Sequence, residues 1–179
     1  MDTKYAAWFA LCLCSGLFGA CSDEEVDAQT AQAAMSELVS SVDTTIMGYQ
    51  SEGQGTGTLN LKCAAGGTAD VNGHVSVATD PVSVDVKVAI AYNACQTHNG
   101  TTLNGQLDFT QSVLAGKVPL RVQTVYEGNV EFTGKVEADC AVNMTVLVDE
   151  AGKTVEVRGT FCDNDAADLD LKLTPRWKS

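Results

Sequence analysis

Residues 82–92, with the sequence VSVDVKVAIAY, decide the fold class of this chain. Every second residue from Val82 to Tyr92 is a large apolar one, whereas Ser83, Asp85 and Lys87 occupy positions between them. Successive side chains of a β-strand point to opposite faces, so this period of two is typical of a strand with one buried face. The stretch therefore predicts a half-buried strand of an antiparallel sheet.

Similar stretches, rich in Val and Thr, occur on both sides of this one. Val and Thr are enriched in strands because β-branched side chains suit a pleated surface. The further candidate strands are 56–63, 68–79, 101–113, 118–128, 129–138, 140–149, 153–162 and 168–175. Turn residues separate them, and the connections are too short for crossover helices. We therefore predict a mainly β domain over 56–179, an antiparallel meander that forms a sandwich or a partly closed barrel.

Residues 23–49 follow a helical period instead. Apolar residues recur there every three or four positions, which is typical of an amphipathic helix. These residues are Ala28, Ala31, Met35, Leu38, Val42, Ile46 and Tyr49. Ser22 and Asp23 are expected to cap its start, and glycines at 53, 55 and 57 prevent it from continuing far. We expect the helix to lie across one face of the domain; a spacer or a partner-binding helix is the alternative.

Residues 1–20 have the composition of an export signal. Lys4 precedes an uncharged apolar stretch that is too short for a usual transmembrane helix. The stretch ends in LFGAC, residues 17–21, and the polar sequence SDEEVDAQ follows. This ending resembles the lipobox of bacterial lipoproteins, in which small residues precede an invariant cysteine. The resemblance covers the signal segment only, and Phe18 stands where Leu is common.

The lipoprotein resemblance implies a membrane-anchored protein. Residues 1–20 would be removed, and Cys21 would carry several acyl chains, which together anchor a protein stably. Residues 21–55 would then hold the lipidated cysteine, the amphipathic helix and a Gly-rich linker. Ser22 stands where enteric lipoproteins that remain in the inner membrane have Asp. The resemblance thus implies a lipid-anchored protein of the bacterial cell envelope, in the outer membrane rather than the inner.

The seven cysteines are consistent with export. Cys12 and Cys14 lie in the signal and Cys21 would be lipidated. The four that remain are Cys63, Cys95, Cys140 and Cys162. In an oxidising compartment four cysteines suggest two disulfides, with three possible connectivities. The chain has no Cys-x-x-Cys pair, so the spacing argues against zinc.

Hairpin arithmetic favours pairing Cys140 with Cys162. Residues 140–149 and 153–162 flank a short turn, and residues that face each other in a hairpin have numbers with a constant sum. A three-residue loop gives the sum 302, which places the two cysteines opposite each other. The sum 303 matches the apolar residues better but requires a one-residue bulge to bring Cys162 across. Cys63 would pair with Cys95 by elimination.

The sequence CDNDAADLDL, residues 162–171, is the most conspicuous polar cluster. Its carboxylates are weak candidates for calcium ligands, because Ca²⁺ prefers oxygen donors. They are Asp163, Asp165, Asp168 and Asp170. The spacing departs from the EF-hand loop, and the last two alternate with leucines as on the exposed face of a strand. We therefore interpret the cluster as a polar turn and a solvated strand face, and predict no metal site.

Composition and motifs argue against several classes of function. The net charge is −12, which is unsuitable for a protein that follows a nucleic-acid backbone. The chain has two His and contains no nucleophile elbow, metalloprotease motif or phosphate-binding loop. We therefore predict a protein that is not an enzyme and needs no cofactor. An enzyme that acts on envelope polymers is kept as an alternative.

Beyond the lipobox, the body loosely resembles small disulfide-bearing bacterial lipoproteins of unassigned function. No motif transfers a functional residue from them. The sequence thus predicts a lipid-anchored envelope protein with a non-catalytic, binding or structural role. Its partners would be the membrane, through the anchor, and an unknown protein or apolar ligand. The alternative is a carrier of an apolar ligand such as lipid in a helix-covered curved sheet, which requires an apolar concave cavity.

Overall fold

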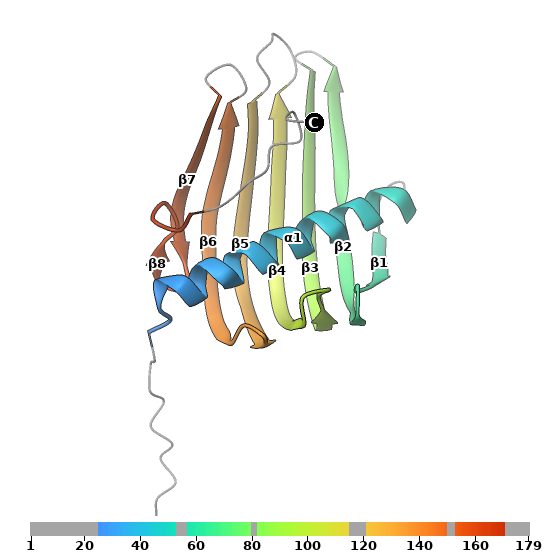
Figure 1. Cartoon of the computed structure of the whole chain (residues 1–179). Coiled ribbons are helices and arrows are strands. Elements are labelled where there is room, and N and C mark those ends of the chain that lie inside the picture. Colours follow the sequence, from blue (N-terminus) through green and yellow to red (C-terminus); the bar gives the residue numbers. More distant parts are fainter. Residues whose placement is uncertain (1–24, 53–56, 80–81, 115–120, 150–152, 171–179) are drawn as a thin grey trace, which may run out of the picture.

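Eight strands and one helix form in the described part of this computed structural model, which comprises residues 25–52, 57–79, 82–114, 121–149 and 153–170 (Figure 1). The elements are α1 (Ala28–Glu52), β1 (Gly57–Lys62), β2 (Gly66–Thr79), β3 (Val82–Gln96), β4 (Thr101–Leu114), β5 (Arg121–Gly134), β6 (Ala138–Asp149), β7 (Thr154–Phe161) and β8 (Asn164–Asp165). Neighbours pair antiparallel in chain order, from β1 to β8. The mainly β class and the meander are therefore confirmed.

The sheet is a single open layer, and α1 forms a second layer on one of its faces (Figure 1). The helix crosses the strands diagonally, from β8 towards β1. No helix in the described segments is long and apolar enough to span a membrane. The expected signal at 1–20, Cys21 and most of the expected linker lie outside the described residues, so these remain predictions.

Two of the predicted strand boundaries are wrong. The sequence predicts separate strands at 118–128 and 129–138, but β5 continues through Gly128 and Asn129. It also predicts a strand at 168–175, whereas residues 168–170 form no strand and the remainder lies outside the described chain. A glycine followed by an asparagine is a common turn signal. Here the glycine bends a strand instead of ending it.

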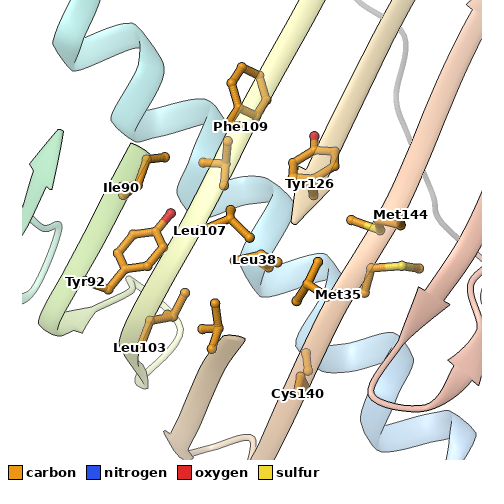
Figure 2. Packing of buried hydrophobic residues seen from close by; sticks show 14 of the residues in the cluster. Met35, Leu38, Ile90, Tyr92, Leu103, Leu107, Phe109, Tyr126, Cys140 and Met144 are labelled. Atoms are coloured by element: carbon orange, nitrogen blue, oxygen red, sulfur yellow. The ribbon is translucent and has the colours of Figure 1, made fainter. Parts of the chain in front are cut away.

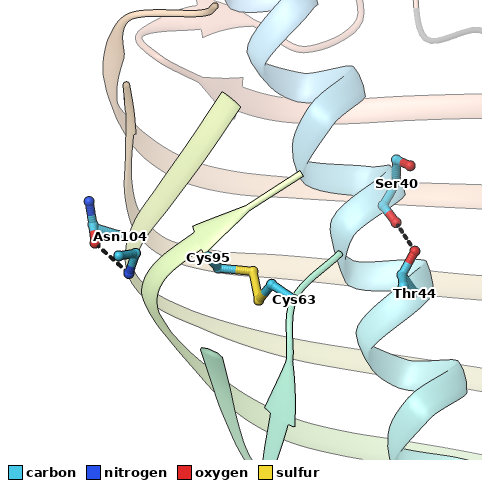
Figure 3. The surroundings of a disulfide bond; sticks show 6 residues. Ser40, Thr44, Cys63, Cys95 and Asn104 are labelled. Atoms are coloured by element: carbon cyan, nitrogen blue, oxygen red, sulfur yellow. Dashed lines mark hydrogen bonds between the residues drawn. A yellow bond between two sulfur atoms is a disulfide. The ribbon is translucent and has the colours of Figure 1, made fainter. Parts of the chain in front are cut away.

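Gly128 on β5 and Gly105 on β4 allow the sheet to bend. Their φ angles are 152° and 117°, a region that disfavours other residues. A Cβ at Gly128 would collide with the backbone oxygen of Gln106, and one at Gly105 with that of Asn129. Glycines at such positions introduce curvature into a sheet. The strands consequently run as arcs behind the helix (Figure 3).

The helix α1 begins at Ala28 because Asp27 caps it. Asp27 Oδ1 accepts hydrogen bonds from the backbone N–H groups of Gln29 (2.9 Å) and Thr30 (3.0 Å), and Oδ2 accepts one from the Thr30 hydroxyl (2.7 Å). These bonds, led by that from the Thr30 hydroxyl, hold the pKa of the Asp27 carboxyl below its usual value. Residues 25–27 are not helical, so the predicted start at residue 23 is wrong.

The buried side of α1 is the predicted apolar stripe without its first residue, Ala28, and with Ala34, which was not predicted, added. Its members are at most 8% exposed: Ala31, Ala34, Met35, Leu38, Val42, Ile46 and Tyr49. Across the interface lie buried sheet residues such as Ile90, Leu107 and Met144 (Figure 2). The rings of Phe109 and Tyr126 add an edge-to-face pair, with centroids 5.5 Å apart. The helix therefore lies across one face of the sheet, as predicted.

Both predicted disulfides are present. The Cys140–Cys162 bond joins β6 to the residue that follows β7, and the Cα atoms are 4.2 Å apart. The β6–β7 register pairs Val142 with Phe161, which corresponds to the sum 303 and shows that the sum 302 is wrong. Cys162 reaches Cys140 because two residues of positive φ follow the end of β7, 47° at Cys162 and 63° at Asp163.

The Cys63–Cys95 bond joins the residue that follows β1 to β3 although β2 lies between the two strands, with Cα atoms 5.4 Å apart. The register of β2 and β3 shifts between Gly66 and Thr68, and that of β3 and β4 shifts between Tyr92 and Cys95. These irregularities bring the two cysteines together at the end of the sheet.

Candidate binding sites on the helix side of the sheet

The helix α1 divides this face of the sheet into two parts, one along each of its flanks. Successive residues of a helix are about 100° apart, so the two flanks can be told apart by residue number. Ser41, Thr44 and Gly48 lie on the flank that faces β1 and residues 97–99. Gln32 and Asp43 lie about half a turn away from Ser41, on the opposite flank.

The first part is a pocket of about 420 Å³ between α1, β1 and the connection from β3 to β4, lined by both polar and apolar groups. The Cys63–Cys95 disulfide forms part of its wall and lies opposite Ser40 and Thr44 (Figure 3). Asn99 Nδ2 donates a hydrogen bond to Glu37 Oε1 (2.8 Å), which ties the connection to the helix. The disulfide and this hydrogen bond therefore hold the walls of the pocket together.

The hydroxyls of Ser41 and Thr45, which line this pocket, lie close to the buried side chain of Tyr92. The Tyr92 hydroxyl nevertheless forms no hydrogen bond of ordinary geometry, and neither does the hydroxyl of the buried Thr101. Burial raises the pKa of Tyr92 to about 12, and the two neighbouring hydroxyls lower it by less. Next to Ser41 and Thr45, the buried Tyr92 hydroxyl is therefore left without a hydrogen bond of ordinary geometry.

Chemically, the pocket offers hydroxyl and amide groups together with the ammonium of Lys62 and the carboxylate of Glu37. Such groups bind small polar molecules through hydrogen bonds. The Glu37 carboxylate already accepts a hydrogen bond from Asn99, and His98 is exposed at the pocket wall. This arrangement is suited to binding a small polar molecule.

The second part is an apolar region at the other end of the strands, beyond the flank of α1 that carries Gln32 and Asp43. One row of paired residues across β2 to β7 consists entirely of valines: Val77, Val84, Val113, Val122, Val148 and Val155. The next row contains Val75, Val86, Val146 and Val157, with Gln111 and Thr124 in its middle. We refer to these two rows as the valine face.

The valine face continues the buried face of the sheet, since its residues alternate in step with Val88 and Ile90. Its margins are the most open: Val77 is 66% exposed, Val75 43% and Val155 41%. On the β2 side the cause is that β1 pairs with β2 only as far as Gly73. Between these margins Val86 and Val146 are buried and the other valines are half-buried, so the exposed apolar surface is confined to the two edges. Exposed apolar surface can mark an interaction site.

Sequence reasoning did not identify either region. The valines are visible in the sequence as alternating residues near the strand ends, but the sequence does not show how far the helix covers each strand. The pocket arises from the connection at residues 97–99 and from the disulfide. No local motif encodes either of them.

The aspartates proposed as weak calcium candidates do not form a metal site. Asp165 Oδ1 accepts a hydrogen bond from the backbone N–H of Ala167 (3.0 Å), and the backbone oxygen of Asp165 accepts one from Asp168 (3.1 Å). Asp163 and Asp170 are exposed. Over the described residues, no group of three His, Cys, Asp or Glu could hold a metal ion. The cluster is a hydrogen-bonded polar turn, and a solvated strand face is not formed there.

The predicted site cysteines divide into two groups. Cys63, Cys95, Cys140 and Cys162 form structural disulfides, while Cys21 lies outside the described residues.

Comparison of the chain with protein-family models, with curated proteins and with solved structures finds no match in any of the three.

Proposed function

We propose that the protein is a lipid-anchored component of the bacterial cell envelope that acts by binding rather than by catalysis. The observation that carries the proposal is the pair of disulfides, Cys63–Cys95 and Cys140–Cys162. Disulfides persist in oxidising compartments, so both bonds support export. The sequence LFGAC supports anchoring through Cys21, and Ser22 favours the outer membrane over the inner.

The anchor is tested by comparing the native protein with Cys21→Ser. We expect the native protein to enter the detergent phase on phase partitioning, and the variant to remain an uncleaved or soluble precursor. Cys14→Ser is the matched control, because this cysteine lies in the signal and should not matter. Mass spectrometry of the N-terminal peptide would show the acyl chains on Cys21. Aqueous partitioning of both native protein and Cys21→Ser would contradict the proposal.

A second candidate function is transport of an apolar ligand such as a lipid, and the valine face favours it. Buried side chains fill the interface between α1 and the sheet, so a ligand would lie beside the helix and not beneath it. One row of valines, and a second row with Gln111 and Thr124 in its middle, supply a largely apolar surface that is open at its margins. Apolar contact is non-directional, which suits a surface for acyl chains.

The carrier function is tested by extracting the native protein and analysing co-purified lipid by mass spectrometry. Val122→Lys places a charge on the valine face, while Gln123→Lys places the same charge on the opposite face of β5. We expect bound lipid to be lost in the first variant and retained in the second. A native protein that carries no lipid would exclude the carrier and leave a protein partner or a structural role.

A further inference from the structure

We propose that residues 171–179 of this chain, LKLTPRWKS, dock on the valine face and cover it. The proposal concerns a contact within the chain and is independent of the membrane anchor. It has four supports: where the described chain ends, how far the segment reaches, its apolar residues and its charge.

The described chain ends beside the flank of α1 that faces towards the valine face. Gln32 Nε2 donates a hydrogen bond to the backbone oxygen of Asp170 (3.1 Å), and the preceding Leu169 is 4% exposed. Gln32 shares its flank of α1 with Asp43. Asp43 lies close enough to Tyr126 to add to the effect of burial in raising the pKa of that tyrosine. Tyr126 is two residues from Thr124, in the second row of the valine face.

The segment is long enough to cross this face. Nine extended residues span about 30 Å. The distance along β7 from Phe161 to Val155 is about 20 Å at strand geometry, and the five strand spacings from β7 to β2 amount to about 24 Å. Either direction across the valine face is therefore within reach of a segment that starts at Asp170.

The composition of the segment complements an apolar surface. Leu171 and Leu173 are separated by Lys172, so an extended chain would place both leucines on one side and the lysine on the other. Trp177 adds the largest apolar side chain. Pro175 has no backbone N–H to donate, which disfavours a helix in this segment. An extended segment with an apolar side is therefore the conformation that this sequence favours.

The charge of the segment complements the rest of the molecule. Three of the eleven Lys and Arg residues lie in it, at Lys172, Arg176 and Lys178, and it contains no Asp or Glu. The net charge of −12 therefore divides into +3 for the segment and −15 for the remainder. Opposite charges of this size attract the segment to the body of the protein.

A bound segment would compete with any other occupant of the valine face. A ligand could bind there only by displacing residues 171–179. Its apparent affinity would therefore be the intrinsic affinity multiplied by the fraction of molecules in which the face is free.

The fluorescence of Trp177 tests the docking. The chain has two tryptophans, and Trp8→Phe leaves Trp177 as the single indole. We expect acrylamide to quench Trp177 several-fold less in this protein than in the free peptide 171–179. Val122→Lys should restore quenching to the level of the peptide, whereas Gln123→Lys, the matched control on the opposite face, should not. Equal effects of the two variants, or full quenching in the parent protein, would overturn the proposal.

A second measurement covers the case in which Val122→Lys does not fold. Removal of residues 171–179 should increase the fluorescence of bound 1-anilinonaphthalene-8-sulfonate several-fold, because the dye reports exposed apolar surface. Unchanged dye fluorescence would overturn the proposal. Protection of Trp177 from acrylamide that disappears on dilution of the protein would also overturn it, because the protection would then come from contact between two copies of the chain. Neither measurement requires a bound lipid or a lipid anchor, so failure here is distinguishable from failure of the proposed function.

Discussion

Two buried tyrosines show how the contribution of a single hydroxyl changes sign according to its partner. The Tyr49 hydroxyl donates a hydrogen bond to the backbone oxygen of Gly73 (2.9 Å), which fastens the end of α1 to β2. The Tyr92 hydroxyl is buried without such a bond. A buried polar group costs free energy when it is unsatisfied and contributes modestly when it is satisfied.

The same substitution should therefore have opposite effects at these two positions. We expect Tyr92→Phe to raise the free energy of unfolding by about 1 kcal/mol and Tyr49→Phe to lower it by about 1 kcal/mol. Urea denaturation of both variants would measure the difference. A loss of stability in Tyr92→Phe would show that a partner, such as an ordered water molecule, satisfies its hydroxyl.

Tyr92 should also make the fold sensitive to alkali. Burial raises the pKa of Tyr92 from 10.0 to about 12, so the folded state disfavours the phenolate. The stabilisation is complete below pH 10 and is lost as the pH rises from 10 to about 12, because the unfolded chain ionises first. Between pH 10 and 12 the free energy of unfolding, measured by urea denaturation at each pH, should fall less steeply for Tyr92→Phe than for the parent protein. Parallel curves would contradict the assignment to this residue.

At the scale of the elements, the periodicity of apolar residues predicted helix and strands correctly, whereas several of the predicted element boundaries were wrong. The period of two at 82–92 and the helical period at 31–49 each reflect one buried face, which the sequence encodes directly. Boundaries depend on backbone details. Asp27, not an earlier residue, caps the helix, and Gly128 bends β5 where the sequence suggests a turn. Such details depend on which neighbour approaches, and a single sequence does not show that.

The cap of α1 can be tested with two neighbouring acidic residues. Asp27→Ala removes the acceptors for two backbone N–H groups at the start of the helix, so we expect a lower melting temperature. Glu25→Ala removes an equal charge that lies before the helix and should change the melting temperature less. Equal melting temperatures of the two variants would indicate that charge near the helix start, and not the cap, is what matters.

The bend in β5 predicts a difference between two glycines with similar φ. Gly57 has a φ of 142° and open space where a Cβ would lie, whereas a Cβ at Gly128 would collide with the Gln106 backbone oxygen. Both alanine variants strain the backbone, but only Gly128→Ala also pushes β5 away from β4. We expect Gly128→Ala to lower the free energy of unfolding by about 2 kcal/mol more than Gly57→Ala. Chemical denaturation compares them, and equal losses would contradict the bend.

In the whole molecule, the two ends of the sheet are stabilised differently. Both disulfides lie at the end that contains the connection at residues 97–100 (Figure 1), while the opposite end carries the valine face. The Cys140–Cys162 pairing could be predicted because both cysteines belong to one hairpin, although the register assumed for that hairpin, the sum 302, is wrong. The other pairing followed by elimination. The functional regions could not be predicted in the same way, since they depend on where α1 crosses the sheet.

Loss of one disulfide should destabilise the molecule substantially. The Cys63–Cys95 bond closes a loop with a separation of 32 residues, and Cys140–Cys162 one of 22. Chain-entropy reasoning assigns about 3–4 kcal/mol to loops of this length. We expect the double variant Cys63→Ser/Cys95→Ser to lose about that much free energy of unfolding, with the other bond intact by peptide mapping. An unchanged free energy of unfolding would contradict a stabilising role for this bond.

The short distance in sequence between Cys21 and the capped start of α1 has a consequence for how an anchored molecule would stand. Glu25, the first described residue, is four positions after Cys21, and four extended residues reach about 14 Å. Because α1 starts at the β8 corner, acyl chains on Cys21 would keep that corner next to the bilayer. The β1 edge, at the other end of the diagonal, would point outward. Anything the protein meets far from the lipid surface would then approach the β1 side first.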